Sequence, residues 1–238
     1  MTCTLYAAPD SFNVVPEMVL EELGVAYHRR ELDRASGEQR QAAYKKLNPQ
    51  GLIPTLTDGD LTLFETAAIC VHLAEKYRRL LPPSESGERS EMFKWLFFLS
   101  NTLHTDLRIF WYTNKYSHDE AAFSGIREAV RERVEAHLDM LEAQMEKQKG
   151  YGMLYLVSQH ITIADFYLAH CLRCARVYPL GSPPLSSYSR WPVLSAWLTQ
   201  MAWRRAVKTA YRNNGVTRTP LTDPRKPDAI DDPGKLVG

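Results

Sequence analysis

The 238-residue sequence has no long apolar segment, little cysteine and almost no net charge. No apolar run approaches the ~20 residues that a membrane-spanning helix needs. The start of the chain, from Met1 to Leu5, also lacks the basic region and the long apolar region of a signal peptide. We therefore expect a cytoplasmic protein that is not inserted in a membrane.

The charges of the chain are balanced. Lysine and arginine total 29, aspartate and glutamate total 28, and the net charge is +1. Proteins that bind nucleic acid through its phosphates need an excess of basic residues. The balance therefore gives no support for a nucleic-acid partner and suits a small ligand of neutral or mixed charge.

The four cysteines are Cys3, Cys70, Cys171 and Cys174. In a cytoplasmic chain of this length they form no disulfide framework. Only Cys171 and Cys174 have the Cys-x-x-Cys spacing of metal and redox sites. They fall inside a predicted helix, however, and no second Cys/His pair completes a metal site. We expect them to pack within that helix, and we predict no bound metal.

Residues 47–69 carry the densest set of structural signals in the chain. Proline cannot donate to a sheet ladder, so Pro54 should stand at the start of a short strand, with the residue before it extended. Asp58-Gly59 predicts the positive φ angles of a two-residue hairpin turn, and residues 61–64 then return as the partner strand. The sequence therefore predicts a hairpin here.

A helix is predicted after the hairpin. Apolar residues recur four apart from Ile69 to Tyr77, and Arg78-Arg79 should close the last turn, where cations suit the helix dipole. At the helix start, free N–H groups, the Thr66 hydroxyl and the Glu65 carboxylate could together hold a group with both a carboxylate and an ammonium. The head of an amino acid has this chemistry.

The preceding residues complete a mixed domain. Strands are predicted over residues 2–7 and 25–32, a helix over 14–23, and a short helix within the polar stretch 33–44. The predicted order of elements over residues 1–81 is therefore βαβαββα.

Residues 82–89 are rich in proline, serine and charge, and we interpret them as a linker. A helical domain is predicted over residues 90–213. It begins with an aromatic stripe from Phe93 to Tyr112, most of which should be core. The apolar pattern from Ile126 to Met145 predicts a long amphipathic helix.

The later part of the helical domain has clear boundary signals. Thr162 and Asp165 have the spacing of a capping box at a helix start. A further helix is predicted from Trp191 to about Arg212. The tail, residues 214–238, contains several prolines, and we expect it to drape over the surface or to be disordered.

The central stretch resembles a pattern of the glutathione S-transferases. That pattern is Asn-Pro-x-Gly-x-Val/Ile-Pro-x-Leu, a hairpin, then Glu-Ser/Thr-x-Ala-Ile, and the chain has Asn48-Pro49-Gln50-Gly51-Leu52-Ile53-Pro54-Thr55-Leu56 and Glu65-Thr66-Ala67-Ala68-Ile69. The run before Asp165 also matches the family. The resemblance implies a thioredoxin-like domain followed by an all-helical domain. The chain lacks the Cys-x-x-Cys pair that redox members of this fold carry between the first strand and the first helix, because Ser11-Phe12-Asn13-Val14 occupies that position.

The resemblance also implies how glutathione would bind. In the family the proline is cis, and the backbone of the residue before it, here Ile53, pairs with the cysteinyl part of glutathione. The Glu-Thr pair takes the γ-glutamyl end. Leu52 departs from the polar residue usual at its position near the glycyl end. The implied glutathione-binding residues are Ser11, Gln39, Leu52, Ile53, Pro54, Glu65 and Thr66.

Ser11 is the predicted thiol-activating residue. It follows Pro9 by two positions, as the serine does in the Tyr-x-x-Pro-Gly-Ser pattern of theta-like and delta-like members, so we assign the chain to a bacterial theta/delta/nu-like serine type. Asp10 replaces the usual glycine, and its charge could raise the thiol pKa. Tyr6 and Asn13 remain rivals, and Ser11 could instead be a plain helix N-cap.

The implied function is transfer of glutathione to a small, apolar electrophile in a cytoplasmic, detoxifying homodimer. The predicted electrophile pocket is formed by Asn101, His104, Arg108, Trp111 and Tyr112. The same site could support a glutathione-dependent isomerase, lyase or peroxidase, and the same fold also occurs in non-catalytic interaction proteins. Intact Ser11 and Glu65-Thr66 favour ligand binding.

Overall fold

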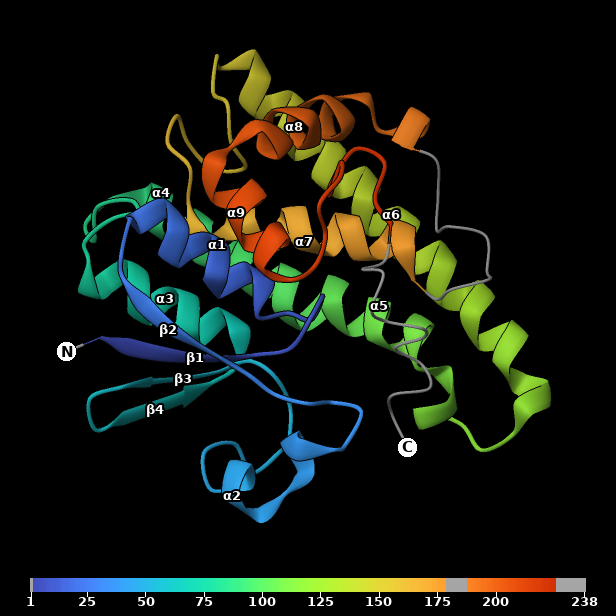
Figure 1. The fold of residues 1–238 in the computed structure, drawn as a ribbon. Coiled ribbons are helices and arrows are strands. Elements are labelled where there is room, and N and C mark those ends of the chain that lie inside the picture. Colours follow the sequence, from blue (N-terminus) through green and yellow to red (C-terminus); the bar gives the residue numbers. More distant parts are fainter. Residues whose placement is uncertain (1, 179–187, 226–238) are drawn as a thin grey trace. The chain divides into compact units, whose positions relative to one another are not determined.

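The computed structural model describes residues 2–178 and 188–225, and within these the chain divides into two compact units (Figure 1). The first unit contains residues 2–81 and Trp203–Pro220, and the second contains Pro82–Ala202 and Leu221–Pro224. The first division falls after Leu81, and α4 begins at Gly87, within the predicted linker.

The first unit has the predicted βαβαββα order around a four-stranded mixed sheet. The sheet order is β2-β1-β3-β4, with β1 and β2 parallel and the other neighbours antiparallel. The strands are β1 (Cys3–Ala7), β2 (Tyr27–Glu31), β3 (Thr55–Asp58) and β4 (Leu61–Phe64). The helices are α1 (Val14–Leu23), the 3₁₀ turn η1 (Glu38–Arg40), α2 (Ala42–Lys45) and α3 (Thr66–Lys76).

The alternation of side chains along the strands separates the two faces of this sheet. Helices α1 and α3 lie on one face of the sheet (Figure 1). Leu5 and its cross-strand partner Leu56 are fully buried. Tyr6, the next residue along β1, points to the other face, where its ring lies 5.8 Å from that of Tyr44 in α2. The sequence alone did not determine the direction of Tyr6.

Two local predictions in this unit are wrong. The hairpin turn is Gly59-Asp60, since Asp58 pairs with Leu61 and only Gly59, at φ 62°, has a positive φ in the turn. The helix that follows ends at Lys76, and Arg78 has φ 52°, so the Arg78-Arg79 pair lies beyond the last turn. In each case the observed strand or helix boundary differs from the predicted one by a residue or two. Boundaries are the features that a periodic pattern predicts least reliably.

The second unit consists of helices. They are α4 (Gly87–Phe97), the π-helical segment η2 (Phe98–Leu103), α5 (His104–Trp111), the short turns η3 (Thr113–Lys115) and η4 (Glu120–Ala122), α6 (Phe123–Gly150), α7 (Ile163–Val177), the turn η5 (Tyr188–Arg190) and α8 (Pro192–Trp203). Most of the aromatic stripe is buried or partly buried, but Phe97 is 55% exposed. Among the described residues, no helix is both long and apolar enough to cross a membrane.

The predicted capping box at the start of α7 is confirmed. The Thr162 N–H donates to an Asp165 carboxylate oxygen at 2.8 Å, and the Asp165 carboxylate also accepts from the buried Leu156 N–H at 3.0 Å. Cys171 and Cys174 are buried within the same helix, as expected from helical packing.

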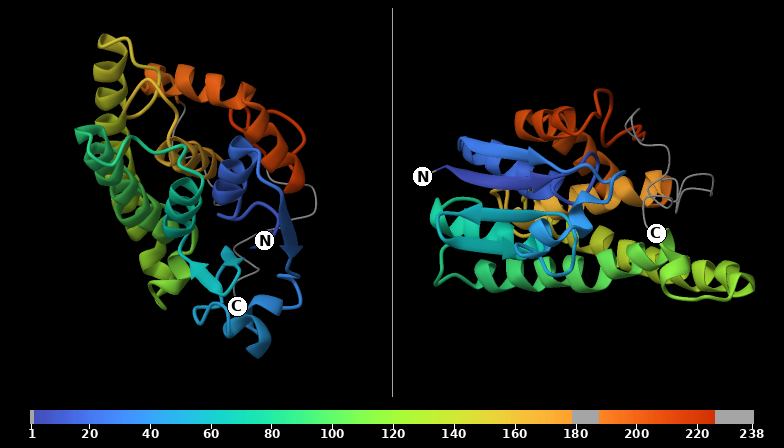
Figure 2. Two further views of the ribbon diagram at one scale, coloured as in Figure 1. Left: turned by 90° about the vertical axis from the view of Figure 1, so that its left-hand side faces the viewer. Right: turned by 60° about the horizontal axis from the view of Figure 1, so that its bottom comes forward.

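The predicted helix from Trp191 to Arg212 is two helices. Arg204 has an extended backbone, with ψ 134°, and separates α8 from α9 (Arg205–Asn213). Helix α9 belongs to the first unit, where it packs against α1 (Figure 2). In the predicted tail, Val216 and Leu221 are buried, and residues 226–238 lie outside the described residues.

Candidate active site

The Ile53-Pro54 peptide bond is cis, as the family resemblance implied, and it leads directly into β3. The preceding carbonyl, that of Leu52, accepts two hydrogen bonds, from the Tyr44 hydroxyl at 2.7 Å and from the Asn48 side-chain amide at 2.8 Å. In the described part of the chain, the Ile53 N–H and C=O have no hydrogen-bond partner. This backbone is therefore held firmly, yet it keeps one donor and one acceptor for an extended ligand.

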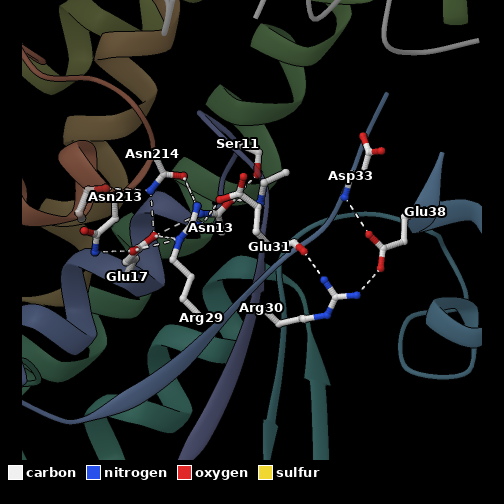
Figure 3. Close-up of polar contacts among 12 residues, drawn as sticks. Ser11, Asn13, Glu17, Arg29, Arg30, Glu31, Asp33, Glu38, Asn213 and Asn214 are labelled. Carbon is white, nitrogen blue, oxygen red and sulfur yellow. Dashed lines mark hydrogen bonds and ion pairs between the residues drawn. The ribbon is translucent and has the colours of Figure 1, made fainter. Parts of the chain in front are cut away.

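Gly51 allows this loop to approach η1 closely. It has φ 66°, and a Cβ there would lie 3.0 Å from the Gln39 carbonyl oxygen. The turn η1 is anchored through Glu38, which accepts from the Asp33 N–H at 2.8 Å and pairs with Arg30 at 2.5 Å (Figure 3). The predicted residue Gln39 thus lies beside the loop that carries Leu52 and Ile53.

Helix α3 begins with a backbone conformation that is rare for glutamate. Glu65 has φ 72° and ψ 114°, and its side chain does not cap the helix. The carboxylate is exposed and accepts from the Gln50 side-chain amide at 3.3 Å. Thr66, by contrast, is buried, and the N–H groups of the first helical turn have no acceptor within the helix. The positive potential of the free N–H groups and the Glu65 carboxylate therefore lie together at the N-terminal end of α3.

Ser11 lies, partly buried, in the loop between β1 and α1. Its hydroxyl donates to the Asn13 side-chain oxygen, and no side chain caps α1, so the alternative that Ser11 is a plain N-cap is wrong. Asp10 has φ 49°, in the left-handed region where glycine is favoured and aspartate is tolerated. Asp10 therefore adopts a left-handed conformation in which glycine would be unstrained.

Asn13 is fully buried and is part of a polar network beneath the loop (Figure 3). Its side-chain oxygen accepts from the Ala8 N–H at 3.0 Å, and its NH₂ group donates to Asn214 at 2.9 Å and to Glu17 at 3.3 Å. The amide hydrogens therefore point into the unit, away from the loop that carries Ser11. Asn13 does not present a donor to a thiol in this conformation.

Family models and known proteins were compared with the chain. Residues 1–75 match the model described as glutathione S-transferase, N-terminal domain, and residues 124–200 match glutathione S-transferase, C-terminal domain. Glutathione S-transferase F10 of Arabidopsis thaliana is 31% identical over 218 residues, which cover 87% of this chain and 95% of the plant protein.

The chain belongs to the glutathione S-transferase family. It is therefore an enzyme of the class that transfers groups to glutathione. A glutathione transferase from Methylococcus capsulatus str. Bath superimposes with a TM-score of 0.76 at 25% identity, covering 90% of this chain and all of the other. A homologue from Sulfitobacter, solved with bound glutathione, has the same fold, with a TM-score of 0.74 at 24% identity and coverage of 90% and 99%.

The predicted electrophile residues of this transferase lie on η2, α5 and the residue after it. Asn101 is exposed in the π-helical segment, a feature that recurs at functional sites. The His104 ring lies 6.0 Å from Trp111, while Arg108 stacks on Tyr112 at 5.8 Å. Since the Trp111 and Tyr112 rings lie 6.4 Å apart, the α5 residues and Tyr112 form one aromatic and cationic cluster. Asn101 accepts a hydrogen bond from the Ser100 hydroxyl at 3.1 Å.

His104 is not arranged as a base. Its Nδ1 lies 2.9 Å from the Tyr167 hydroxyl, and its Nε2 is shielded from solvent. Burial of the ring, with a smaller effect of the nearby Arg108 charge, lowers the pKa of His104 to about 3. A neutral histidine with so low a pKa accepts a proton poorly near neutral pH. A packing role fits this residue.

The residues that hold the site in place were not predicted from the sequence. Tyr44 and Asn48 fix Leu52, while Glu17 and Asn214 fix Asn13. Asn48 is part of the family pattern, but that pattern does not indicate its hydrogen bond to Leu52. No pattern along the chain connects Asn214 to Asn13, because they are 201 positions apart. Across the described ranges, no group of three or more His, Cys, Asp or Glu side chains is placed to hold a metal ion.

Proposed function

We propose that this transferase binds reduced glutathione in its first unit and that Ser11 activates the thiol for attack on a small, apolar electrophile. The observation that carries the proposal is the start of α3, where the exposed Glu65 carboxylate stands next to Thr66 and the free N–H groups of the first turn. The γ-glutamyl end of glutathione has a matching ammonium and carboxylate. Glutathione bound to the Sulfitobacter homologue supports this proposal.

The middle of glutathione would then pair with the Ile53 backbone, whose donor and acceptor before the cis-proline have no partner among residues 2–178 and 188–225. Pairing of this kind is strand addition, in which main-chain hydrogen bonds supply affinity. Gln39 and Leu52 are assigned to the glycyl end. Leu52 is 40% exposed, so its side chain is available to cover a ligand although it offers no polar contact.

Thiol activation is needed because a cysteine thiol with a pKa of about 8.5 is only roughly 3% ionised at pH 7. The N-terminal end of α1 contributes a favourable dipole, and a hydroxyl that donates to the sulfur adds a charge-assisted hydrogen bond. Ser11 lies in the loop that feeds this helix end. The thiolate then attacks an electrophilic carbon and displaces the leaving group. The aromatic cluster on α5 favours an apolar substrate.

The test combines binding and turnover. Reduced glutathione at 100 times Kd should stabilise the protein by about 2.7 kcal/mol in a thermal shift. Thioether formation with aryl halides and epoxides would then show transfer, whereas oxidised glutathione and an alcohol formed from hydroperoxides would show peroxidase chemistry. The absence of any shift at millimolar glutathione would exclude the proposal and favour a non-catalytic interaction protein.

We also propose that the transferase is a cytoplasmic homodimer with a role in detoxification. The support for a dimer is the family and the exposed aromatic surface of α4, where Phe97 stacks on Phe93 at 6.0 Å. Light scattering should give twice the chain mass of 27.2 kDa. A mass of one chain across micromolar concentrations would contradict the dimer.

A further inference from the structure

The hydrogen bonds around Asn214, the residue that follows α9, determine which way its side-chain amide faces. Its NH₂ group donates to a Glu17 carboxylate oxygen at 2.8 Å and to the Ala210 carbonyl at 2.8 Å, and both partners can only accept. Its oxygen faces the NH₂ group of Asn13 at 2.9 Å and the Arg29 guanidinium at 3.3 Å, which can only donate there. Only one orientation of this amide satisfies all four partners.

The orientation of Asn13 follows from that of Asn214. The Asn13 NH₂ group meets the Asn214 oxygen, so the Asn13 oxygen faces the loop and accepts from the Ala8 N–H at 3.0 Å. A backbone N–H is always a donor, which confirms this direction independently. The Ser11 hydroxyl approaches the same oxygen and must therefore donate to it. Each residue therefore donates to the next, from Ser11 to Asn13, from Asn13 to Asn214 and from Asn214 to Glu17. Figure 3 shows these bonds.

The network is built for rigidity. Asn13, Glu17 and Asn214 are all fully buried, and the Glu17 charge is compensated by Arg29, with the Nε atom 3.4 Å from the carboxylate, and by a hydrogen bond from Tyr27 at 3.1 Å. Buried polar groups that are fully satisfied specify one arrangement, since any alternative leaves a donor or acceptor unpaired.

We propose that Asn13 and Asn214 are positioning residues for thiol activation, through which α9 holds the Ser11 loop in its working shape. The inference rests on the proposed role of Ser11. The bond from Ala8 to Asn13 ties the two ends of the loop together, and Asn214 keeps the Asn13 amide turned toward that bond. Ser11 is thereby held beside the α1 terminus.

The Ser11 hydroxyl has a single proton, so it can donate either to Asn13 or to the glutathione sulfur but not to both. In the structure this proton is donated to the Asn13 side-chain oxygen. A thiolate carries a full charge and is a stronger acceptor than a neutral amide, so the hydroxyl turns to the sulfur when glutathione binds. The Ala8 bond to Asn13 does not involve that proton and persists through the change. The loop therefore keeps its shape in both states.

Asn213 and Asn214 provide a matched pair for the test. Each donates one hydrogen bond to Glu17, at 2.9 Å and 2.8 Å, but only Asn214 contacts Asn13. The experiment compares Asn214→Ala with Asn213→Ala by the absorbance of bound thiolate against pH and by glutathione Kd. Asn214→Ala should raise the thiol midpoint by about 0.5 to 1 unit, the equivalent of one neutral hydrogen bond, and leave Kd within about twofold. Asn213→Ala should leave both unchanged.

An unchanged midpoint in Asn214→Ala, or an equal shift in both variants, would overturn the positioning role. Asn214→Ser, a smaller loss, replaces the alanine variant if that protein does not fold. Ser11→Ala separates this inference from the proposed function. A midpoint raised in Ser11→Ala but not in the Asn214 variants refutes only the positioning role, whereas an unchanged midpoint in Ser11→Ala refutes the role of Ser11 itself.

Discussion

The two ends of the proposed glutathione site are built in different ways. At the α3 end, the Glu65 carboxylate is exposed, and its contact with Gln50 spans only 15 positions of the chain. At the α1 end, Ser11 rests on a buried network that includes Asn214, 201 positions from its partner Asn13. The first end is a local motif, whereas the second exists only after the chain has folded.

This difference suggests a division of labour. An exposed carboxylate at a helix start can recognise a charged ligand without further support, because recognition depends on charge at one place. Activation of a thiol depends on the direction of one hydroxyl, which needs a rigid base. We therefore expect variants at the α3 end to change affinity and variants at the α1 end to change the thiol pKa.

The largest expected effect is on affinity. Glu65→Gln removes the charge that meets the glutathione ammonium, and one charge-assisted hydrogen bond is worth about 1.5–3 kcal/mol, so Kd should rise roughly ten- to hundredfold. Asp60→Asn, which removes an equally exposed charge from the hairpin turn, is the control and should leave Kd unchanged. Calorimetric titration measures both. A Kd that rises equally in the two variants would show a general charge effect.

The next effect is on reactivity. Ser11→Ala should raise the pKa of the bound thiol by roughly one to two units, since it removes a hydrogen bond to a charged group. Turnover should fall near neutral pH and recover at higher pH, with Kd little changed. Tyr6→Phe should do much less. A thiol pKa that is raised in Tyr6→Phe and unchanged in Ser11→Ala would move the activating role to Tyr6. It would also contradict the contrast drawn between the α1 and α3 ends of the site.

A third prediction concerns His104, whose pKa is lowered to about 3 by burial. Between this value and the ordinary 6.5, the unfolded chain binds a proton that the folded chain does not, so stability falls as pH decreases through this window. His104→Gln should reduce that slope by up to about 1.4 kcal/mol per pH unit. Urea unfolding at pH 5 and pH 6 measures it. Equal slopes in the two proteins would mean that folding does not lower the pKa of His104, and His104 would then be a candidate base.

The smallest effect is expected from Tyr44→Phe. Burial raises the pKa of Tyr44 to about 12, so its hydroxyl stays protonated and donates to Leu52 across the assay range. Its loss leaves Asn48 as a partner and should cost about 0.5–1.5 kcal/mol, a few-fold in Kd, with no change in the thiol pKa. Tyr27→Phe removes a hydroxyl from the network around Glu17 and should leave Kd unchanged. An unchanged Kd in Tyr44→Phe with a raised Kd in Tyr27→Phe would contradict the expectation that the network around Glu17 affects the thiol pKa and not the affinity.

Much of the fold was predictable because its signals are local. The run around Pro54 predicted a strand start, and Thr162 with Asp165 predicted a helix start, because proline chemistry and capping depend on neighbours within a few residues. The prediction failed at Arg204, where the structure has two helices instead of the one predicted from Trp191 to about Arg212. Periodicity does not register a single extended residue between two helices.

Residue types close together in the chain predicted the order of elements in the first unit, the strand start at Pro54 and the carboxylate at the start of α3. The cis form of the Ile53-Pro54 bond was implied by the family resemblance. Tertiary structure alone decided that Ser11 does not cap its helix, that Asn13 turns its hydrogens inward and that α9 packs on α1. The physical reason is that an amide's orientation depends on the donors and acceptors around it. Here these come from Ala8, Glu17 and Asn214, which only folding brings together.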